Sequence, residues 1–213
     1  MQQMFAACDP YSFFDRFEGI PKLVIDATND EFFMPDDEYY WWPQFPEPRF
    51  FEMVPDAEHS LSTGIEQLVP TVATFVNSYL NDYAYPDIEW TIDYSGNGSI
   101  TATLTGNTTR VKKAVRFHGL SCTGLPARRD FRVINLDDPC LCGVKVDTGE
   151  YCGNAESLFF ATELTAVSND GRQIVFVAEP PEVPKDHWMA FFIAIQYEMF
   201  QVICICTIII LKN

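Results

Sequence analysis

The chain has 213 residues, of which 47% are hydrophobic and 15% aromatic, and this composition excludes an intrinsically disordered protein. The length allows one domain or two small ones. The formal net charge is −16 at pH 7, and phosphate backbones and anionic membrane surfaces repel such a chain. We therefore expect no nucleic-acid partner and no membrane partner.

The first 80 residues alternate between helical and strand-like patterns, which is typical of an α/β arrangement. Leu23–Thr28 is apolar almost without interruption, as in strands that a parallel sheet buries on both faces. The predicted order is a short helix, a buried strand, a helix that begins after Pro35, a second strand and a long helix that Pro70 kinks or splits. These elements are expected near Tyr11–Phe17, Leu23–Thr28, Asp36–Trp42, Arg49–Val54 and Ser62–Asn81.

The pattern changes after Tyr85-Pro86 to short β-like runs separated by turn signals such as Ser95–Gly98 and Asn169–Gly171. About seven short strands with this punctuation predict an immunoglobulin-like β-sandwich. We expect strands over Ile88–Tyr94, Ser99–Leu104, Val111–Phe117, Phe131–Ile134, Leu158–Val167 and Gln173–Ala178, with a last one from Trp188. The predicted division is an α/β part over 1–85, a β-sandwich over 86–200 and an apolar tail over 201–213.

Two polar residues follow the two predicted parallel strands. Asp30 comes just after Leu23–Thr28, and His59 comes just after Arg49–Val54. In α/β-hydrolases the triad follows the chain order nucleophile, acid, histidine. Ends of adjacent parallel strands would bring a carboxylate and an imidazole together at one sheet edge, where the carboxylate orients the ring. Asp30 and His59 are therefore candidate catalytic residues, against the simpler interpretation of a turn aspartate and a surface histidine.

Longer motifs around these two residues resemble the PhoPQ-activated pathogenicity-related family, which includes autocrine proliferation repressor proteins. The specific parts are Thr28–Phe33 (TNDEFF) and Val54–Leu61 (VPDAEHSL); Ala127–Arg132 and Trp188–Ile193 resemble later family segments, with His187 where a glycine is usual. The resemblance implies an α/β-hydrolase fold, here its C-terminal fragment, followed by a β domain, and export from the cell.

The resemblance also implies a nucleophile on an elbow upstream of the acid. No G-x-S-x-G string occurs in the sequence, and the nearest one, Gly119–Gly124, has the wrong spacing. We therefore expect a hydrolase-like chain that holds the acid and the histidine without the nucleophile, and that shows no hydrolase turnover by itself. No cofactor is expected. The chain does not open with a signal peptide, so we expect its natural N-terminus to lie upstream.

The chain has seven cysteines, and four of them, Cys122, Cys140, Cys142 and Cys152, fall within one stretch. Zinc binding is the alternative to disulfides, but classical zinc sites space their paired cysteines by two or more residues. Cys140 and Cys142 are unfavourably placed to bond to each other. We therefore expect Cys122 and Cys152 each to bond to one of them, in either order.

Two sequons, at Asn97 and Asn107, lie in the predicted β region and are candidate glycosylation sites. Together with the cysteines they favour a secreted, extracellular protein. Met199–Leu211 is strongly apolar but too short to span a bilayer, which needs about 20 residues. A last strand followed by non-native sequence is preferred there over a membrane anchor.

Three functions remain open. The first is a catalytically incomplete hydrolase that acts on a substrate that the sequence does not identify. The second is a secreted signalling or binding protein that uses the same fold as a scaffold for a cell-surface receptor. The third is a purely structural extracellular β-sandwich, which fits poorly with the motifs in the first 80 residues.

Overall fold

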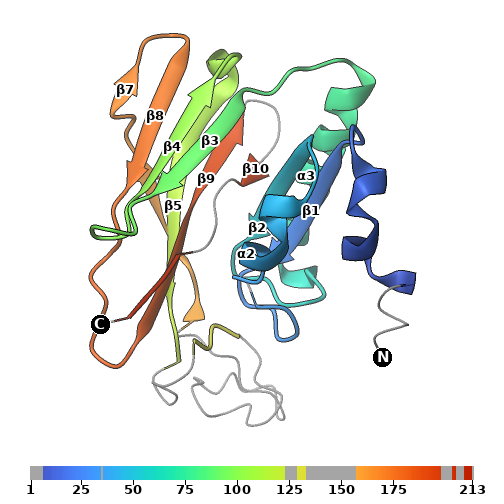
Figure 1. The fold of residues 1–213 in the computed structure, drawn as a ribbon. Coiled ribbons are helices and arrows are strands. Elements are labelled where there is room, and N and C mark those ends of the chain that lie inside the picture. Colours follow the sequence, from blue (N-terminus) through green and yellow to red (C-terminus); the bar gives the residue numbers. More distant parts are fainter. Residues whose placement is uncertain are drawn as a thin grey trace.

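The structure is a computed structural model, and it describes residues 7–34, 36–122, 129–132, 157–197, 203–204 and 209–212. Most of the regular structure in these ranges is β, arranged in three sheets (Figure 1). One sheet has two parallel strands, one has four antiparallel strands and one has five. One long α-helix and several short helical turns accompany them.

The predicted fold class is wrong in its first part, the fragment of an α/β-hydrolase fold, and its second part, the immunoglobulin-like sandwich, stays a prediction. The described residues contain a single pair of parallel strands and are dominated by antiparallel sheets. The physical reason is that alternating helix and strand patterns report local structure only. The number of strands that share a sheet depends on contacts between distant segments, which a local pattern does not encode.

The described residues between 7 and 85 fold around the parallel pair. Strands β1 and β2 pair in register from Lys22↔Arg49 to Ala27↔Val54. The first helical turn begins as expected, because the Asp9 side chain accepts a hydrogen bond from the Tyr11 N–H at 3.0 Å. The elements are η1 (Pro10–Phe17), β1 (Lys22–Ala27), α2 (Glu38–Trp41), η2 (Trp42–Gln44), β2 (Arg49–Val54), η3 (Ser62–Gly64) and α3 (Ile65–Leu80), and α3 continues through Pro70.

The later residues form two antiparallel sheets that share one hydrophobic cluster, and these two sheets are called the β-sandwich below. The four-stranded sheet has the order β3-β4-β8-β7, and the larger sheet has the order β10-β9-β5-β6, with β11 also paired to β9. The predicted strand at Phe131–Ile134 is not formed at Phe131 and Arg132, and its other two residues lie outside the described ranges. The elements are β3 (Asp87–Ile92), β4 (Ile100–Thr105), η4 (Thr108–Arg110), β5 (Val111–Leu120), β6 (Phe160–Leu164), β7 (Ser168–Asn169), β8 (Gln173–Ala178) and β9 (Trp188–Tyr197).

The apolar C-terminal segment contributes strands rather than only a tail. β10 (Ile203–Cys204) and β11 (Ile209–Lys212) both pair antiparallel with β9, at Ile203↔Ile195 and Ile209↔Phe191. They therefore occupy the edge of β9 opposite to β5. None of the helices in the described ranges combines the length and apolar character that crossing a bilayer requires.

Strand β9 is buried on both faces, unlike the strands of the four-stranded sheet. Buried and partly exposed positions alternate along β4 and β8, whereas every residue from Met189 to Ile195 is buried. Figure 1 shows the reason, because β9 and β5 lie between the four-stranded sheet and the unit built on β1 and β2. One hydrophobic cluster accordingly includes residues from both parts of the chain: Trp42, Phe51 and Met53 with Ile100, Phe176, Phe192 and Ile193.

Candidate active site

The parallel pairing of β1 and β2 brings Asp30 and His59 to one edge of the sheet. The strands end together at Ala27 and Val54. The loops that follow stay in contact, since the Thr28 N–H donates to the Val54 carbonyl at 3.1 Å. Both candidate residues therefore leave the sheet at its carboxyl end, as the spacing along the sequence predicted.

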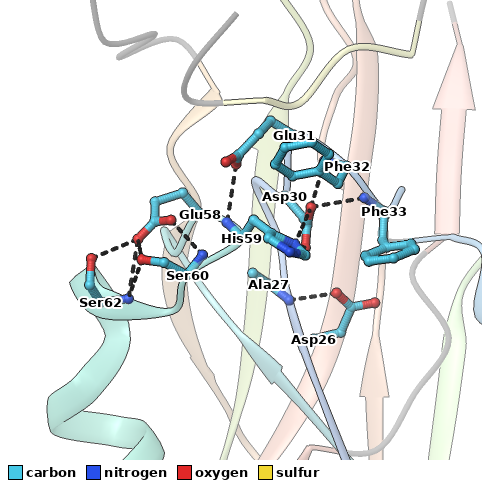
Figure 2. Close-up of polar contacts among 10 residues, drawn as sticks. All are labelled: Asp26, Ala27, Asp30, Glu31, Phe32, Phe33, Glu58, His59, Ser60 and Ser62. Atoms are coloured by element: carbon cyan, nitrogen blue, oxygen red, sulfur yellow. Dashed lines mark hydrogen bonds and ion pairs between the residues drawn. The ribbon is translucent and has the colours of Figure 1, made fainter. Parts of the chain in front are cut away.

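The Asp30 carboxylate and the His59 imidazole are in hydrogen-bond contact. Nδ1 of His59 lies 2.9 Å from Oδ2 of Asp30 and 3.2 Å from Oδ1 (Figure 2). The Asp30 side chain is 6% exposed and the His59 side chain is 41% exposed. Oδ1 also accepts the backbone N–H groups of Phe32 and Phe33, at 2.7 and 2.8 Å. The acid is thus held in place by its own loop, while the ring extends toward solvent.

The hydrogen bond to Asp30 raises the pKa of His59, outweighing partial desolvation, and the nearby Glu31 and Glu58 carboxylates act in the same direction. The Glu31 side chain also accepts the His59 backbone N–H at 3.1 Å. An imidazole supported in this way binds a proton more tightly than a free one. The contact has the geometry in which a carboxylate orients an imidazole, and an imidazole held in this way can act as a general base.

Two phenylalanine rings flank the imidazole. The centroid of Phe32 lies 4.7 Å from that of His59, and the centroid of Phe33 lies 5.5 Å away. Both rings are largely exposed, at 64% and 59%. Figure 2 shows the Phe32 ring above the Asp30–His59 contact and the Phe33 ring to the right of it. The histidine is therefore bordered by accessible apolar rings as well as by the carboxylates of Asp30, Glu31 and Glu58.

Glu58 fastens the loop that carries His59. Its carboxylate accepts the backbone N–H and the hydroxyl of Ser60, at 2.6 and 2.7 Å, and those of Ser62, at 3.1 and 2.8 Å (Figure 2). Partial burial raises the pKa of Glu58, but these four hydrogen bonds outweigh it and hold the pKa at about 2. The Glu58 carboxylate therefore fixes the backbone on the C-terminal side of His59.

A second carboxyl group, Asp26 on β1, lies below the pair. It accepts the Ala27 N–H at 2.8 Å. Burial raises its pKa to about 7, the Ala27 hydrogen bond opposes that shift, and the carboxylates of Asp30 and Asp37 add to it. Sequence reasoning missed both Asp26 and Glu58. The serines two and four positions after Glu58 were a usable signal, whereas nothing in the sequence marks the burial of Asp26.

The structure describes the remaining candidate residues only in part. Cys122 is buried, while Cys140, Cys142 and Cys152 lie outside the described residues, so their pairing stays a prediction. Asn97 is exposed in the turn between β3 and β4. Asn107 is partly buried, and its side chain donates to the Ala84 carbonyl at 3.2 Å. Within the described ranges no cluster of three or more histidine, cysteine or carboxylate residues could hold a metal ion.

The comparisons with known proteins decide the family. The model of the PhoPQ-activated pathogenicity-related proteins matches residues 1–132, a range that includes both strand-end loops. The chain belongs to the PhoPQ-activated pathogenicity-related family. A relative in this family is autocrine proliferation repressor protein A of Dictyostelium discoideum, which is 32% identical over 149 residues. That match covers 67% of this chain and 29% of the relative, and no solved structure matches the chain.

Proposed function

We propose that this member of the PhoPQ-activated pathogenicity-related family supplies the acid and the base of a hydrolytic site. The observation that carries the proposal is the 2.9 Å contact between Nδ1 of a half-exposed His59 and the buried carboxylate of Asp30. The Asp30 carboxylate accepts a hydrogen bond from the Nδ1–H of His59, and this leaves Nε2, the other ring nitrogen, free to act as the base. That nitrogen takes the proton of an attacking hydroxyl or thiol and later returns it to the leaving group.

The nucleophile comes from outside residues 1–213 in this proposal. The sequence has no G-x-S-x-G elbow, and the chain spans 29% of the length of the curated relative that it matches. An acid and a histidine without a nucleophile retain only a small part of the acceleration that a complete triad provides. The 213-residue chain by itself should therefore fail to react with fluorophosphonate probes, which label activated serines.

An activated ester tests the imidazole directly. We expect the chain to hydrolyse p-nitrophenyl acetate faster than free imidazole does, and we expect His59→Gln and Asp30→Asn to remove the excess. His187→Gln is the matched control, because the Nδ1 of His187 lies 2.9 Å from the Ser121 carbonyl and contacts no carboxylate in the described structure. An ester rate that His59→Gln leaves unchanged contradicts the proposal, and so does stoichiometric fluorophosphonate labelling of the chain.

The alternative function is binding or signalling without catalysis. It is favoured by the name of the relative, a proliferation repressor, and by the exposed rings of Phe32 and Phe33, which would suit a protein partner at the cell surface. Purified chain and its His59→Gln variant, added to proliferating Dictyostelium cells, separate the two functions. Equal repression by both proteins favours binding alone, and loss of repression in the variant favours chemistry at His59.

Export from the cell belongs to the same proposal. It is supported by the sequons at Asn97 and Asn107 and by the four clustered cysteines. Peptide mapping of material collected from the medium should find glycans at one or both asparagines, and Cys122 and Cys152 each bonded to Cys140 or Cys142. Four free thiols in such material would count against an extracellular protein.

A further inference from the structure

A buried network of hydrogen bonds ties the acid-bearing loop to the β-sandwich. Asn29 is fully buried, and its side-chain nitrogen donates to the carbonyls of Phe131 and Ser157, at 2.6 and 2.8 Å. These acceptors lie 102 and 128 positions later in the chain. Both amide hydrogens of Asn29 are therefore used on segments that flank the sheet formed by β5, β6 and β9.

The network continues through the histidine-bearing loop. The Asn29 side-chain oxygen accepts the Thr28 hydroxyl at 2.7 Å, and that hydroxyl accepts the Asp56 backbone N–H at 2.9 Å. The Asp56 carboxylate in turn accepts the Phe159 N–H at 2.6 Å. Five hydrogen bonds thus connect the two strand-end loops with each other and with Phe131, Ser157 and Phe159. Thr28, Ser157 and Phe159 are buried as well, and Asp56 is partly buried, so water has little access to the bonds made by Asn29.

The anchor points stand next to the catalytic candidates. Asn29 immediately precedes Asp30, and Asp56 comes three residues before His59. Asp56 also adopts a left-handed backbone conformation, with φ of 59°, which a non-glycine residue keeps when its surroundings stabilise it. The backbone N–H of Asn29 donates to the Ala57 carbonyl at 3.1 Å, so the loop that carries Asp30 is also hydrogen-bonded to the loop that carries His59. A displacement of either anchor would change the distance between the carboxylate and the imidazole.

We propose that Thr28, Asn29 and Asp56 are positioning residues through which the β-sandwich sets the contact between Asp30 and His59. In this proposal the β-sandwich helps to fix the distance between the Asp30 carboxylate and the His59 imidazole. The inference rests on the proposed function in treating Asp30 and His59 as a functional pair. Its test measures the pairing itself and needs no turnover.

The measurement is the pKa of His59, followed by NMR in the full 213-residue chain with labelled histidine. The chain has three histidines, so His118→Gln and His187→Gln assign the signals. Asp30→Asn provides the reference for a lost pair, because it replaces the charged partner that raises the His59 pKa. We expect Thr28→Val and Asp56→Ala to lower the His59 pKa by at least about half of the drop that Asp30→Asn causes.

Matched variants keep the hydrogen bonds and should keep the pairing. Thr28→Ser retains the hydroxyl, and Asp56→Asn retains an oxygen that accepts the Phe159 N–H, so both should leave the His59 pKa at its wild-type value. Asn29→Ala removes both donors and should give the largest shift among the network variants. The signals of His187 should not move in any of these proteins.

Two results would overturn the inference. The first is a wild-type His59 pKa in folded Thr28→Val and Asp56→Ala, which would make the network purely structural. The second is unfolding of every bond-deleting variant while its conservative partner stays folded, which again assigns the network to stability alone. Ester hydrolysis tests a different statement. If the wild-type chain does not hydrolyse the ester but the His59 pKa still responds to the network variants, the proposed function is refuted and the positioning role stands.

Discussion

The β-sandwich and the unit built on β1 and β2 bury their apolar residues very differently. Each residue from Met189 to Ile195 in β9 is at most 2% exposed. By contrast, α3 leaves Val69 58% exposed and Leu80 78% exposed, in a stripe that also includes Ile65, Val72 and Val76. Spacings of three and four residues place these side chains on one face of the helix. Apolar side chains are therefore covered in β9 and left open on α3.

The two regions nevertheless depend on each other. The hydrophobic cluster joins Phe51 and Met53 of β2 to Phe192 and Ile193 of β9. The candidate residues Asp30 and His59 follow the ends of β1 and β2, the strand that supplies Phe51 and Met53 to this cluster. The boundary expected near residue 85 therefore separates two patterns of sequence, while the packing continues across it.

Met53→Ala should produce the largest effect on stability. Met53 is fully buried in the shared cluster, and truncation of such a residue typically costs about 2–5 kcal/mol of unfolding free energy. Because both regions share the cluster, one loss should lower the denaturation midpoint of both. Denaturation followed by NMR of fluorinated tryptophan can check this, with Trp42 reporting the first region and Trp90 reporting β3.

The matched control is Val69→Ala, which removes apolar atoms from an exposed position of the same chain. It should change the unfolding free energy reported by either tryptophan by no more than about 0.5 kcal/mol. A Met53→Ala protein in which Trp42 unfolds early and Trp90 keeps its wild-type midpoint would show two independent folding units, and would contradict a shared cluster.

Asp26→Asn should change the pH dependence of stability. The folded-state pKa of Asp26 is raised from 3.8 to about 7, so the folded chain binds a proton between these values that the unfolded chain releases. Stability should therefore fall as pH rises from about 4 to 7, by at most about 4 kcal/mol at 1.36 kcal/mol per pKa unit. The Asn variant should lack this part of the slope in urea titrations at several pH values. An unchanged slope would place Asp26 in a more solvated position than the structure does.

Glu58→Gln should have a smaller effect that is confined to the histidine loop. The lowered pKa of Glu58 stabilises the folded chain above pH 4.5, and this contribution is lost as pH falls toward 2. Since the carboxylate is mostly solvated, we expect less than about 1 kcal/mol. Hydrogen exchange of the Ser60 and Ser62 amides should accelerate in the variant while the β9 amides keep their protection. Equal acceleration in both places would contradict a local role.

Val69→Gln and Val76→Gln should change stability least. Both side chains are exposed on α3, so a polar replacement removes little buried apolar surface. The unfolding free energy of each variant should stay within about 0.5 kcal/mol of the wild-type value. Removing two members of the apolar stripe should raise the solubility limit of the chain. A marked loss of stability in either variant would show that the stripe is already covered in solution.

Sequence reasoning identified Asp30 and His59 because their signal is local. Each follows a short strand that could be recognised from its own residues, and parallel strands end at the same edge of a sheet. The long helix over Ile65–Leu80 was equally accessible from its apolar spacing. The hydrolase fold was predicted wrongly because strand count and sheet partners are properties of the assembled chain.

The network around Asn29 could not be predicted for the same reason. Its acceptors are backbone carbonyls of Phe131 and Ser157, and a carbonyl carries no residue-type signal. Asn29 and Asp56 look like ordinary turn residues in the sequence. Only the fold shows that a side chain next to the acid is buried between segments more than 100 positions away.

The length of these connections has a consequence for synthesis on the ribosome. The ring and the carboxylate of the pair have both been translated once residue 59 has been added, yet the partner of Asp56 is Phe159 and one partner of Asn29 is Ser157. The nascent chain must therefore hold two unanchored loops while about 100 further residues are made, since distant contacts form only after the intervening chain exists. The candidate site is then completed only when the residues of the β-sandwich have been made, long after Asp30 and His59 themselves.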